Sequence, residues 1–355
     1  MKKVFALFVM GVMLLLACTR QPVEQAFFAF PLKTANIGYP EADYSCTDEL
    51  PFFMPSSECL IFDTLILSNG RKDYLFHLFS LNSGEPVGSF CMKGRSWNEP
   101  ISAIAPSEIH SKGKNHFVDV FSFMDGKLLE WNISASLREG KDIYERIVQL
   151  DSGKFMPILS LWRLDDNHVL AFNSAQDPYE DNMESLPEYV IYNLSDGSVQ
   201  QEFNVFVLPV FQESNSNYTS KNIFSCVDCM KPDRKKLMFF MNTMPVYGII
   251  DMQKRSVNCF YMADLKGFAP EEFRWHFADA VGDDDCVYVL YSGGILYDSD
   301  GAEIPKTLFT IGWDGTVLKK YNLDRNYTNL CRDSSNLYLT NPSGTSVRIP
   351  TGRLK

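Results

Sequence analysis

Short apolar runs, broken at brief intervals by turn residues, constrain this fold more than any other feature of the sequence. Runs such as Tyr74–Phe79 and Leu308–Gly312 are rich in β-branched and aromatic residues, and no apolar stripe with helical spacing lasts beyond two turns. The clearest unit places four such runs between Glu58 and Phe90, with Asn82-Ser83-Gly84 as one of its turns. This pattern predicts antiparallel four-stranded sheets.

The four-run unit recurs along the whole chain. We place the repeats at residues 56–100, 101–148, 155–206, 220–262, 273–323 and 328–350. Repeats of this length predict an all-β fold, a six-bladed β-propeller of four-stranded antiparallel blades. The last repeat holds only about three runs, so we expect an N-terminal strand at Ala26–Leu32 to complete it and close the ring.

Three Asp-Gly pairs mark hairpin turns within the repeats. They fall at residues 125–126, 196–197 and 314–315. Asp-Gly is typical of type I′ turns, in which both central residues have positive φ. We therefore predict tight type I′ hairpins at these positions.

The N-terminus carries an export signal. Lys2 and Lys3 precede the apolar run Val4–Leu16, which is too short to span a membrane, and Leu15-Leu16-Ala17 leads directly into Cys18. We predict a signal peptide over residues 1–17, lipid attachment at Cys18, a tether over 18–25 and a propeller domain over 26–355. Several acyl chains on one cysteine anchor a protein durably without a transmembrane helix.

Charge and composition argue against some classes of binding partner. The formal net charge is −11, and removal of Lys2 and Lys3 makes it −13. This balance argues against nucleic acid, which binds clustered Lys and Arg, and against electrostatic adhesion to anionic lipid. The expected membrane contact is therefore the lipid anchor.

The cysteines and histidines do not predict a metal site or a cofactor. Eight cysteines remain besides Cys18, scattered through apolar runs, and we expect most of them to be buried thiols. The single Cys-x-x-Cys, Cys226 to Cys229, lacks the second pair or the nearby histidines of a structural zinc site. Five histidines are present, and no two have metal-ligand spacing on one element.

Several segments resemble a known family. The lipobox, the six loose repeats, Phe76–Gly84 and the loop Lys93–Glu99 resemble Bacteroides-type lipoproteins with a TolB-like six-bladed β-propeller, and Tyr288–Gly293 is similar as well. Members often carry a Gly-x-Gly-Pro-x-Glu loop after the first blade. This chain keeps Gly94 and Glu99 but has Ser96-Trp97 in place of Gly-Pro. The resemblance implies the fold and an envelope location, and it implies no reaction.

Two groups of residues are candidate ligand-binding positions. Strand alternation in the run after Glu272 puts Arg274 and His276 on the face opposite its aromatic residues, where an innermost strand would direct them to the channel mouth. Arg163 would occupy the equivalent place in the third blade. Their alternative role is as solvated polar positions.

The second group lies in the family-like loop. Trp97 stands between Arg95 and Glu99 and could stack on a ligand or anchor a protein partner. Alternatively, the loop has only a structural role and holds one blade against the next. Asp283–Asp285 and the segment from Asp298 resemble calcium loops, but turns stabilised by Asp side chains explain both more simply.

No catalytic signature is present: the chain lacks a phosphate-binding loop, a dinucleotide fingerprint, a His-Glu-x-x-His motif and a nucleophile elbow. Our leading hypothesis is a non-catalytic envelope lipoprotein that binds a protein or a small ligand. The alternative is a hydrolase or lyase with its active site at the channel mouth, because propellers support both. A purely structural envelope component is the third possibility. The residues after Cys18 lack an acidic surface-export signal, which favours the periplasmic face of the outer membrane.

Overall fold

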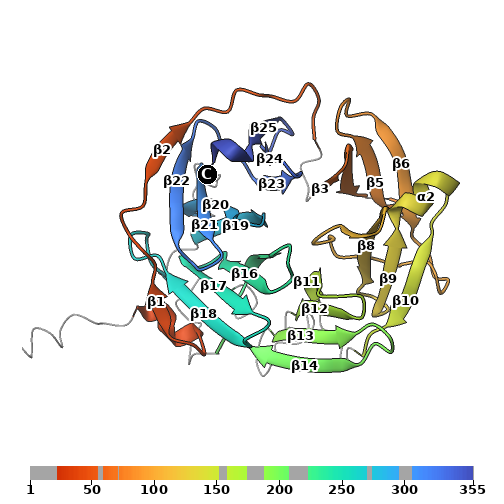
Figure 1. Cartoon of the computed structure of the whole chain (residues 1–355), viewed down its shortest axis with the longest axis horizontal. Coiled ribbons are helices and arrows are strands. Elements are labelled where there is room, and N and C mark those ends of the chain that lie inside the picture. The colour runs from red at the N-terminus through yellow and green to blue at the C-terminus, as the bar shows by residue number, and fades with distance from the viewer. Residues whose placement is uncertain are drawn as a thin grey trace, which may run out of the picture.

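The strands form six sheets arranged in a ring (Figure 1). The computed structural model describes residues 22–54, 59–70, 72–151, 158–173, 188–207, 223–269, 274–295 and 306–354. The predicted six-bladed β-propeller is confirmed. The predicted signal peptide and Cys18 lie outside the described residues.

Blades 1 to 3 are four-stranded, and their strands follow chain order. Blade 1 contains β3 (Cys59–Phe62), β4 (Leu65–Asn69), β5 (Tyr74–Ser80) and β6 (Pro86–Met92). Blade 2 contains β7 (His110–Lys112), β8 (Asn115–Ser122), β9 (Lys127–Asn132) and β10 (Tyr144–Gln149), with helix α2 (Ile133–Glu139) between the last two. Blade 3 contains β11 (Ile158–Arg163), β12 (His168–Asn173), β13 (Glu188–Asn193) and β14 (Val199–Asn204).

Blades 4 and 5 each gain a fifth strand, whereas blade 6 has three. Blade 4 contains β15 (Cys226–Met230), β16 (Lys236–Met241), β17 (Val246–Asp251) and β18 (Ser256–Tyr261). Blade 5 contains β19 (Arg274–Gly282), β20 (Cys286–Ile295), β21 (Thr307–Gly312) and β22 (Val317–Leu323). Blade 6 contains β23 (Asn329–Arg332), β24 (Asn336–Thr340) and β25 (Ser346–Pro350), followed by the 3₁₀ turn η3 (Thr351–Arg353).

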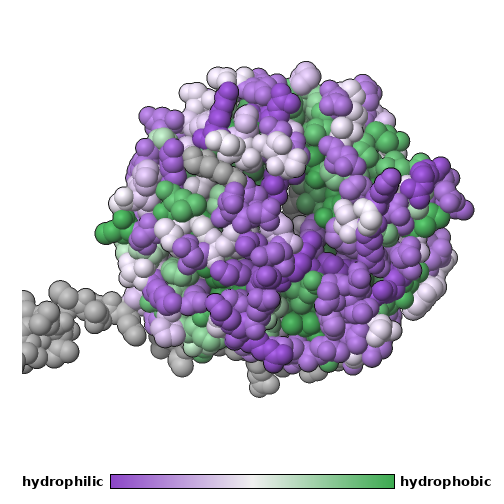
Figure 2. Space-filling model, viewed as in Figure 1, coloured by the Kyte–Doolittle hydropathy of each residue, from purple (hydrophilic) through white to green (hydrophobic). Residues whose placement is uncertain are grey.

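The ring has two faces, which we name by their connections. The turn face carries the turn between the first and second strands of each blade and the turn between the third and fourth strands. In blade 4 these two turns are hydrogen-bonded to each other, because the N–H of Met252 donates to Lys235 O at 2.8 Å. The linker face carries the turns from second to third strands and the connections between blades. In blade 4 the connection after β18 is hydrogen-bonded to the turn between β16 and β17, because the N–H of Met262 donates to Pro245 O at 3.0 Å. Figure 2 shows one face of the ring, largely hydrophilic and hollowed near its centre, with hydrophobic residues gathered over β5, β6 and α2.

Burial follows the position of each strand in its blade. All six residues of β17 are buried, because a middle strand is covered on both faces by neighbouring blades. The outer strand β14 instead has no buried residue, and exposed and half-buried residues alternate from Gln200 on. Short apolar runs therefore form inner and middle strands, and alternating runs form outer ones.

Aromatic side chains fill the spaces between blades. Phe76 of blade 1 stacks on Trp131 of blade 2 with ring centroids 5.6 Å apart, and Phe240 of blade 4 meets Phe277 of blade 5 at 5.5 Å. Between the last and first blades, Tyr338 and Cys59 belong to one apolar cluster. Apolar packing thus continues around the whole ring.

The N-terminal segment pairs with the outside of the ring and does not occupy the predicted position. Ala26–Leu32 does not complete blade 6: η1 (Val23–Phe27) is a 3₁₀ helix, and β1 (Leu32–Thr34) pairs in parallel with β18 of blade 4. β2 (Glu41–Tyr44) then pairs in parallel with β22 of blade 5. Residues 48–50 then reach the outer edge of blade 6, where Glu49 bridges to Val347 and the N–H of Arg348 donates to Asp48 O at 2.8 Å. The segment passes around the outside of three blades (Figure 1).

The reason lies in the aromatic residues of the segment. Phe27 and Phe28 are 2% and 4% exposed, and the Phe27 ring lies 5.1 Å from that of Phe268, at the junction of blades 3 and 4. The Glu24 carboxylate accepts the Phe268 N–H nearby. The sequence shows that this run must be buried but not which blade buries it.

The Asp-Gly turns also differ from the prediction. Gly126, Gly197 and Gly315 have positive φ, but the aspartates before them do not. A type I′ turn requires both. Asp196 and Asp314 instead accept backbone N–H groups two residues ahead, a local bond that stabilises the longer turn with glycine in the left-handed region.

Within the described residues, no helix has the length and apolar character needed to cross a membrane.

We predict that Phe27→Ala lowers the free energy of unfolding by about 3–4 kcal/mol, since it leaves a cavity where η1 meets blades 3 and 4. Val23→Ala in the same helix serves as the control, because Val23 is 65% exposed and its truncation should change little. Chemical denaturation measures both. Equal effects of the two substitutions would show that η1 does not stabilise the ring.

Candidate functional site

Three strands of blade 2 place His110, Asp119 and Glu130 on one face of the sheet. Asp119 of β8 pairs directly with Glu130 of β9, and His110 of β7 pairs with Phe117, two residues from Asp119. All three side chains are buried, Glu130 completely. The sheet register therefore brings residues distant in the sequence into one cluster.

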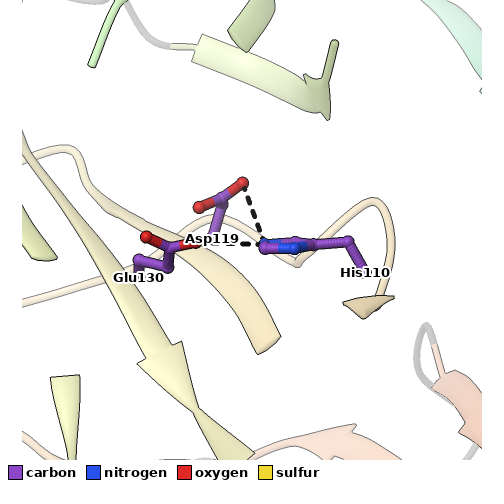
Figure 3. Close-up of side chains that lie close together, drawn as sticks. All are labelled: His110, Asp119 and Glu130. Atoms are coloured by element: carbon purple, nitrogen blue, oxygen red, sulfur yellow. Dashed lines mark ion pairs between the residues drawn. The ribbon is translucent and has the colours of Figure 1, made fainter. Parts of the chain in front are cut away.

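The three side chains converge (Figure 3). His110 Nε2 lies 3.6 Å from Asp119 Oδ2 and 3.8 Å from Glu130 Oε1. Both distances exceed those of a hydrogen bond, and His110 Nε2 has no hydrogen-bond partner. The ring nitrogen thus lies between two carboxylates without being bonded to either.

Cations from neighbouring strands neutralise the carboxylates. Arg163 of β11 crosses from blade 3, and its guanidinium pairs with both oxygens of Asp119, with Nε 2.9 Å from Oδ2. Its Nη2 also lies 3.2 Å from Glu130 Oε1. Lys112 Nζ is 2.6 Å from the same oxygen, and Arg146 Nε is 3.9 Å from Oε2. Two opposed acids are tolerated because three cations surround them.

This arrangement shifts the pKa values of Asp119 and Arg163. Burial would raise the pKa of Asp119, but the adjacent His110 and the charge of Arg163 outweigh burial and lower it. Burial would likewise lower the pKa of Arg163, yet Asp119 and Glu130 raise it. Each group holds its partner in the charged state, so the cluster joins blades 2 and 3 as a buried ion network.

His110, Asp119 and Glu130 are the one group of described residues that could hold a metal ion, with ligand atoms within 4.8 Å of one another. A divalent cation prefers ligands with excess negative charge. Here Arg163 and Lys112 already pair with the carboxylates that would coordinate it. An ion would have to displace both, so the cluster supports a structural ion network better than a metal site.

The sequence predicts Arg163 at the channel mouth. In the structure its side chain is buried in the interface between blades 2 and 3, where it pairs with Asp119. Asp119 and Glu130 were not predicted as site residues. A signal for them exists, because each is a single acid within a short apolar run, in Phe117–Phe121 and Leu128–Trp131. A charge at such a position predicts a buried partner, but not which one.

Arg274 and His276 begin β19, the predicted innermost strand, but they do not protrude from it. The register shifts between Trp275 and Phe277, and this bulge breaks the alternation on which the prediction rested. His276 is fully buried and neither ring nitrogen has a hydrogen-bond partner. Burial, and then the charge of Arg274, lower its pKa to about 3.

The loop with Arg95, Trp97 and Glu99 is organised by its own polar contacts. The Glu99 carboxylate accepts the Ser96 N–H at 3.1 Å, and hydrogen bonding to Ser96 lowers its pKa. Lys127 Nζ donates to Trp97 O at 3.2 Å and lies 5.5 Å from the centre of the indole. These contacts fix the loop and leave Trp97 60% exposed.

Trp97 belongs to a group of exposed apolar side chains on the linker face. Ile101, in the same connection, donates its N–H to Ser122 Oγ at the end of β8, and the N–H of Met124 donates to Ser102 Oγ. Phe123 and Met124 form the turn between β8 and β9 and are 42% and 57% exposed. We call Trp97, Ile101, Phe123 and Met124 the rim patch.

A further buried acid lies between blades 3 and 4. Asp228 of β15 accepts Ser160 Oγ–H at 2.6 Å and Trp162 Nε1–H at 3.1 Å, both from β11. Burial raises its pKa to about 6, although these donors lower it in part. Uncharged donors hold this carboxyl, in contrast to the cations around Asp119.

The remaining predicted groups are structural where they are described. Asp283 accepts the N–H groups of Asp285 and Cys286 and the hydroxyl of Tyr288, as expected of a turn. The segment from Asp298 lies outside the described residues. The eight described cysteines form no disulfide, and seven of them are buried.

The fold defines the class of this protein as a six-bladed β-propeller. The crystal structure of a DUF4221-family protein from Bacteroides vulgatus is similar, with a TM-score of 0.59 and 13% identity over 86% of this chain and 96% of that one. Two more distant structural matches are BamB from Moraxella catarrhalis (TM-score 0.39, 10% identity, 82% of each chain) and hydrazine synthase from Kuenenia stuttgartiensis (TM-score 0.48, 11% identity, 81% of this chain and 80% of that one). At these identities the likeness extends to the fold alone.

No protein-family model and no curated protein matches the sequence.

We predict that Arg163→Leu lowers the free energy of unfolding by about 3–5 kcal/mol, because Asp119 and Glu130 lose their shared cation in a buried site. Adding Asp119→Asn should recover part of the loss. The control Arg325→Leu breaks the exposed pair with Glu49 and should leave the denaturation midpoint nearly unchanged. A loss below about 1 kcal/mol for Arg163→Leu would contradict the ion network.

Asp228 predicts a pH dependence of stability. Its folded pKa of about 6 exceeds the unfolded value of about 3.9, so protonated Asp228 favours folding below pH 4 and this contribution is lost as pH rises through 6. Asp228→Asn should therefore raise the free energy of unfolding by about 1–2 kcal/mol at pH 8 and leave it unchanged at pH 4. Urea titrations across this range measure it. A variant less stable than the wild type at pH 8 would refute the assignment.

Proposed function

We propose that this protein is a lipid-anchored, non-catalytic binding protein of the bacterial envelope, and that the rim patch engages a protein partner. The rim patch is the observation that supports the proposal. Contiguous exposed apolar side chains on a soluble domain are typical of interaction sites. The propeller fold is compatible with a binding or scaffold role in general.

The composition of the rim patch suits a protein interface. Trp97, Phe123 and Met124 are of the types enriched at interface centres, and a polar margin is supplied by Arg95, Glu99 and Asp125. Lys127 fixes the backbone beneath Trp97, so little conformational freedom would be lost on binding. These features favour a protein over a small ligand, which would require a concave pocket.

The hydrolase or lyase alternative has one observation in its favour. His110, Asp119, Glu130 and Arg163 bring a histidine, two carboxylates and a guanidinium together, as an acid–base site requires. However, all four are buried, and the carboxylates are paired with cations. A substrate could not reach them without breaking the interface of blades 2 and 3, so we favour binding.

The anchor and the location are part of the proposal. Lipid attachment at Cys18, the periplasmic face of the outer membrane and a relation to TolB-like propeller lipoproteins are all supported by the sequence pattern. Mass spectrometry of the mature N-terminus tests the lipid. An unmodified Cys18, or a chain that still begins at Met1, would contradict it.

We predict that Trp97→Ala weakens partner binding at least tenfold, since an aromatic anchor at an interface centre commonly contributes 2 kcal/mol or more. Tagged full-length protein would be purified from the detergent-solubilised envelope of its host, and the copurified protein titrated against each purified variant. Leu318→Ala, an exposed leucine on β22 outside the rim patch, is the matched control.

The titration separates the outcomes. Loss of binding with Trp97→Ala and with Phe123→Ser, but not with Leu318→Ala, supports the rim patch. Unchanged binding in all three variants places the interface elsewhere and refutes it. Circular dichroism shows that each variant is folded.

A further inference from the structure

We infer that the propeller is held with its linker face toward the membrane, so that the partner of the rim patch is itself a membrane protein. The inference rests on the proposed lipid attachment at Cys18. It adds an orientation and a class of partner to the proposed function.

The first argument is the reach of the tether. Four residue steps separate Cys18 from Pro22, the first described residue, and they span at most about 14 Å when fully extended. A propeller domain of this size has a diameter of about 50 Å by globular scaling. A blade built on six-residue strands is about 20 Å high. The tether is therefore too short to bring the opposite face to the bilayer.

The second argument is the point at which the chain enters the fold. η1 packs on connections between blades: the Phe27 ring lies 6.5 Å from Phe224, before β15, and 5.1 Å from Phe268, after β18. Val207, in the connection after β14, donates its N–H to Phe27 O at 3.0 Å. These connections belong to the linker face, so η1, the first described element, packs on the ring at that face.

The third argument is the distribution of exposed apolar side chains. Beyond the rim patch, the linker face carries Phe53, beside Gly344 of blade 6, and Leu159, at the start of β11. On the turn face, the exposed apolar residues Val87, Val199 and Leu318 each lie at the start of the fourth strand of a blade, on three different blades. The rim patch thus lies on the same face of the ring as the connections on which η1 packs.

Charge favours a protein over lipid as the occupant of this face. Half-buried Glu99 and Asp125 border the rim patch, and the formal net charge is −11. Hydrogen bonding to Ser96 lowers the pKa of Glu99, so this acid is charged at neutral pH. Anionic headgroups would be repelled here, whereas a protein surface can supply matching donors or cations. A partner that reaches a surface directed at the bilayer must be held in the membrane.

The test measures the height of two matched positions above a bilayer. The test uses Met124→Cys on the linker face of blade 2 and Val87→Cys at the turn face of the adjacent blade 1; Met124 and Val87 are 57% and 47% exposed. Each lipidated full-length variant is labelled with a polarity-sensitive donor dye and reconstituted in phosphatidylethanolamine–phosphatidylglycerol vesicles that contain a lipid acceptor dye. Unsubstituted protein gives the background from its own cysteines.

We expect the donor at residue 124 to lie closer to the acceptors than the donor at residue 87, by on the order of 10–20 Å. Equal distances would mean that the ring stands on its edge, and a closer residue 87 would mean the reverse orientation; either result overturns the inference. A blue-shifted emission at residue 124 in vesicles without a partner would show insertion into lipid and overturn the protein partner. If the purified protein lacks lipid, the proposed anchor fails, a result distinct from all of these.

Discussion

Apolar packing between the faces of neighbouring blades is the interaction on which the rest of the structure depends. A middle strand such as β17 is buried on both faces, and pairs such as Phe76 with Trp131 fill the space between sheets. A ring built this way is stable only if it has no open gap. The N-terminal segment supports the ring from outside: it adds strands to blades 4 and 5 and touches the edge of the three-stranded blade 6.

The same dry interfaces explain the buried polar groups. A charge placed there must be paired, and the structure meets this requirement in two ways. Asp119 and Glu130 share cations, above all Arg163 from the next blade, and these ion pairs join two blades. Asp228 receives only neutral donors, Ser160 and Trp162, and burial raises its pKa to about 6. Chemistry-bearing residues at such positions serve the architecture.

Function is therefore expected where the packing constraint ends, in the connections on the linker face. Trp97 and Met124 are exposed there on backbone fixed by Lys127 and Ser102, which combines a rigid support with apolar side chains in solvent. This face also receives the N-terminal segment. With the proposed lipid at Cys18, a ring that has the rim patch on this face is suited to contacts at the membrane rather than to capture of a freely diffusing substrate.

The sequence by itself determined the class of fold, because the period of apolar runs and the turn residues between them are local properties. It also determined Trp97 as a candidate, since the loop is a continuous segment. It could not place Ala26–Leu32 or show the bulge that buries His276, because both depend on distant strands. Only the tertiary structure decided that Arg163 meets Asp119 and Glu130: three residues on two blades are brought together by sheet register and ring closure, which no local pattern encodes.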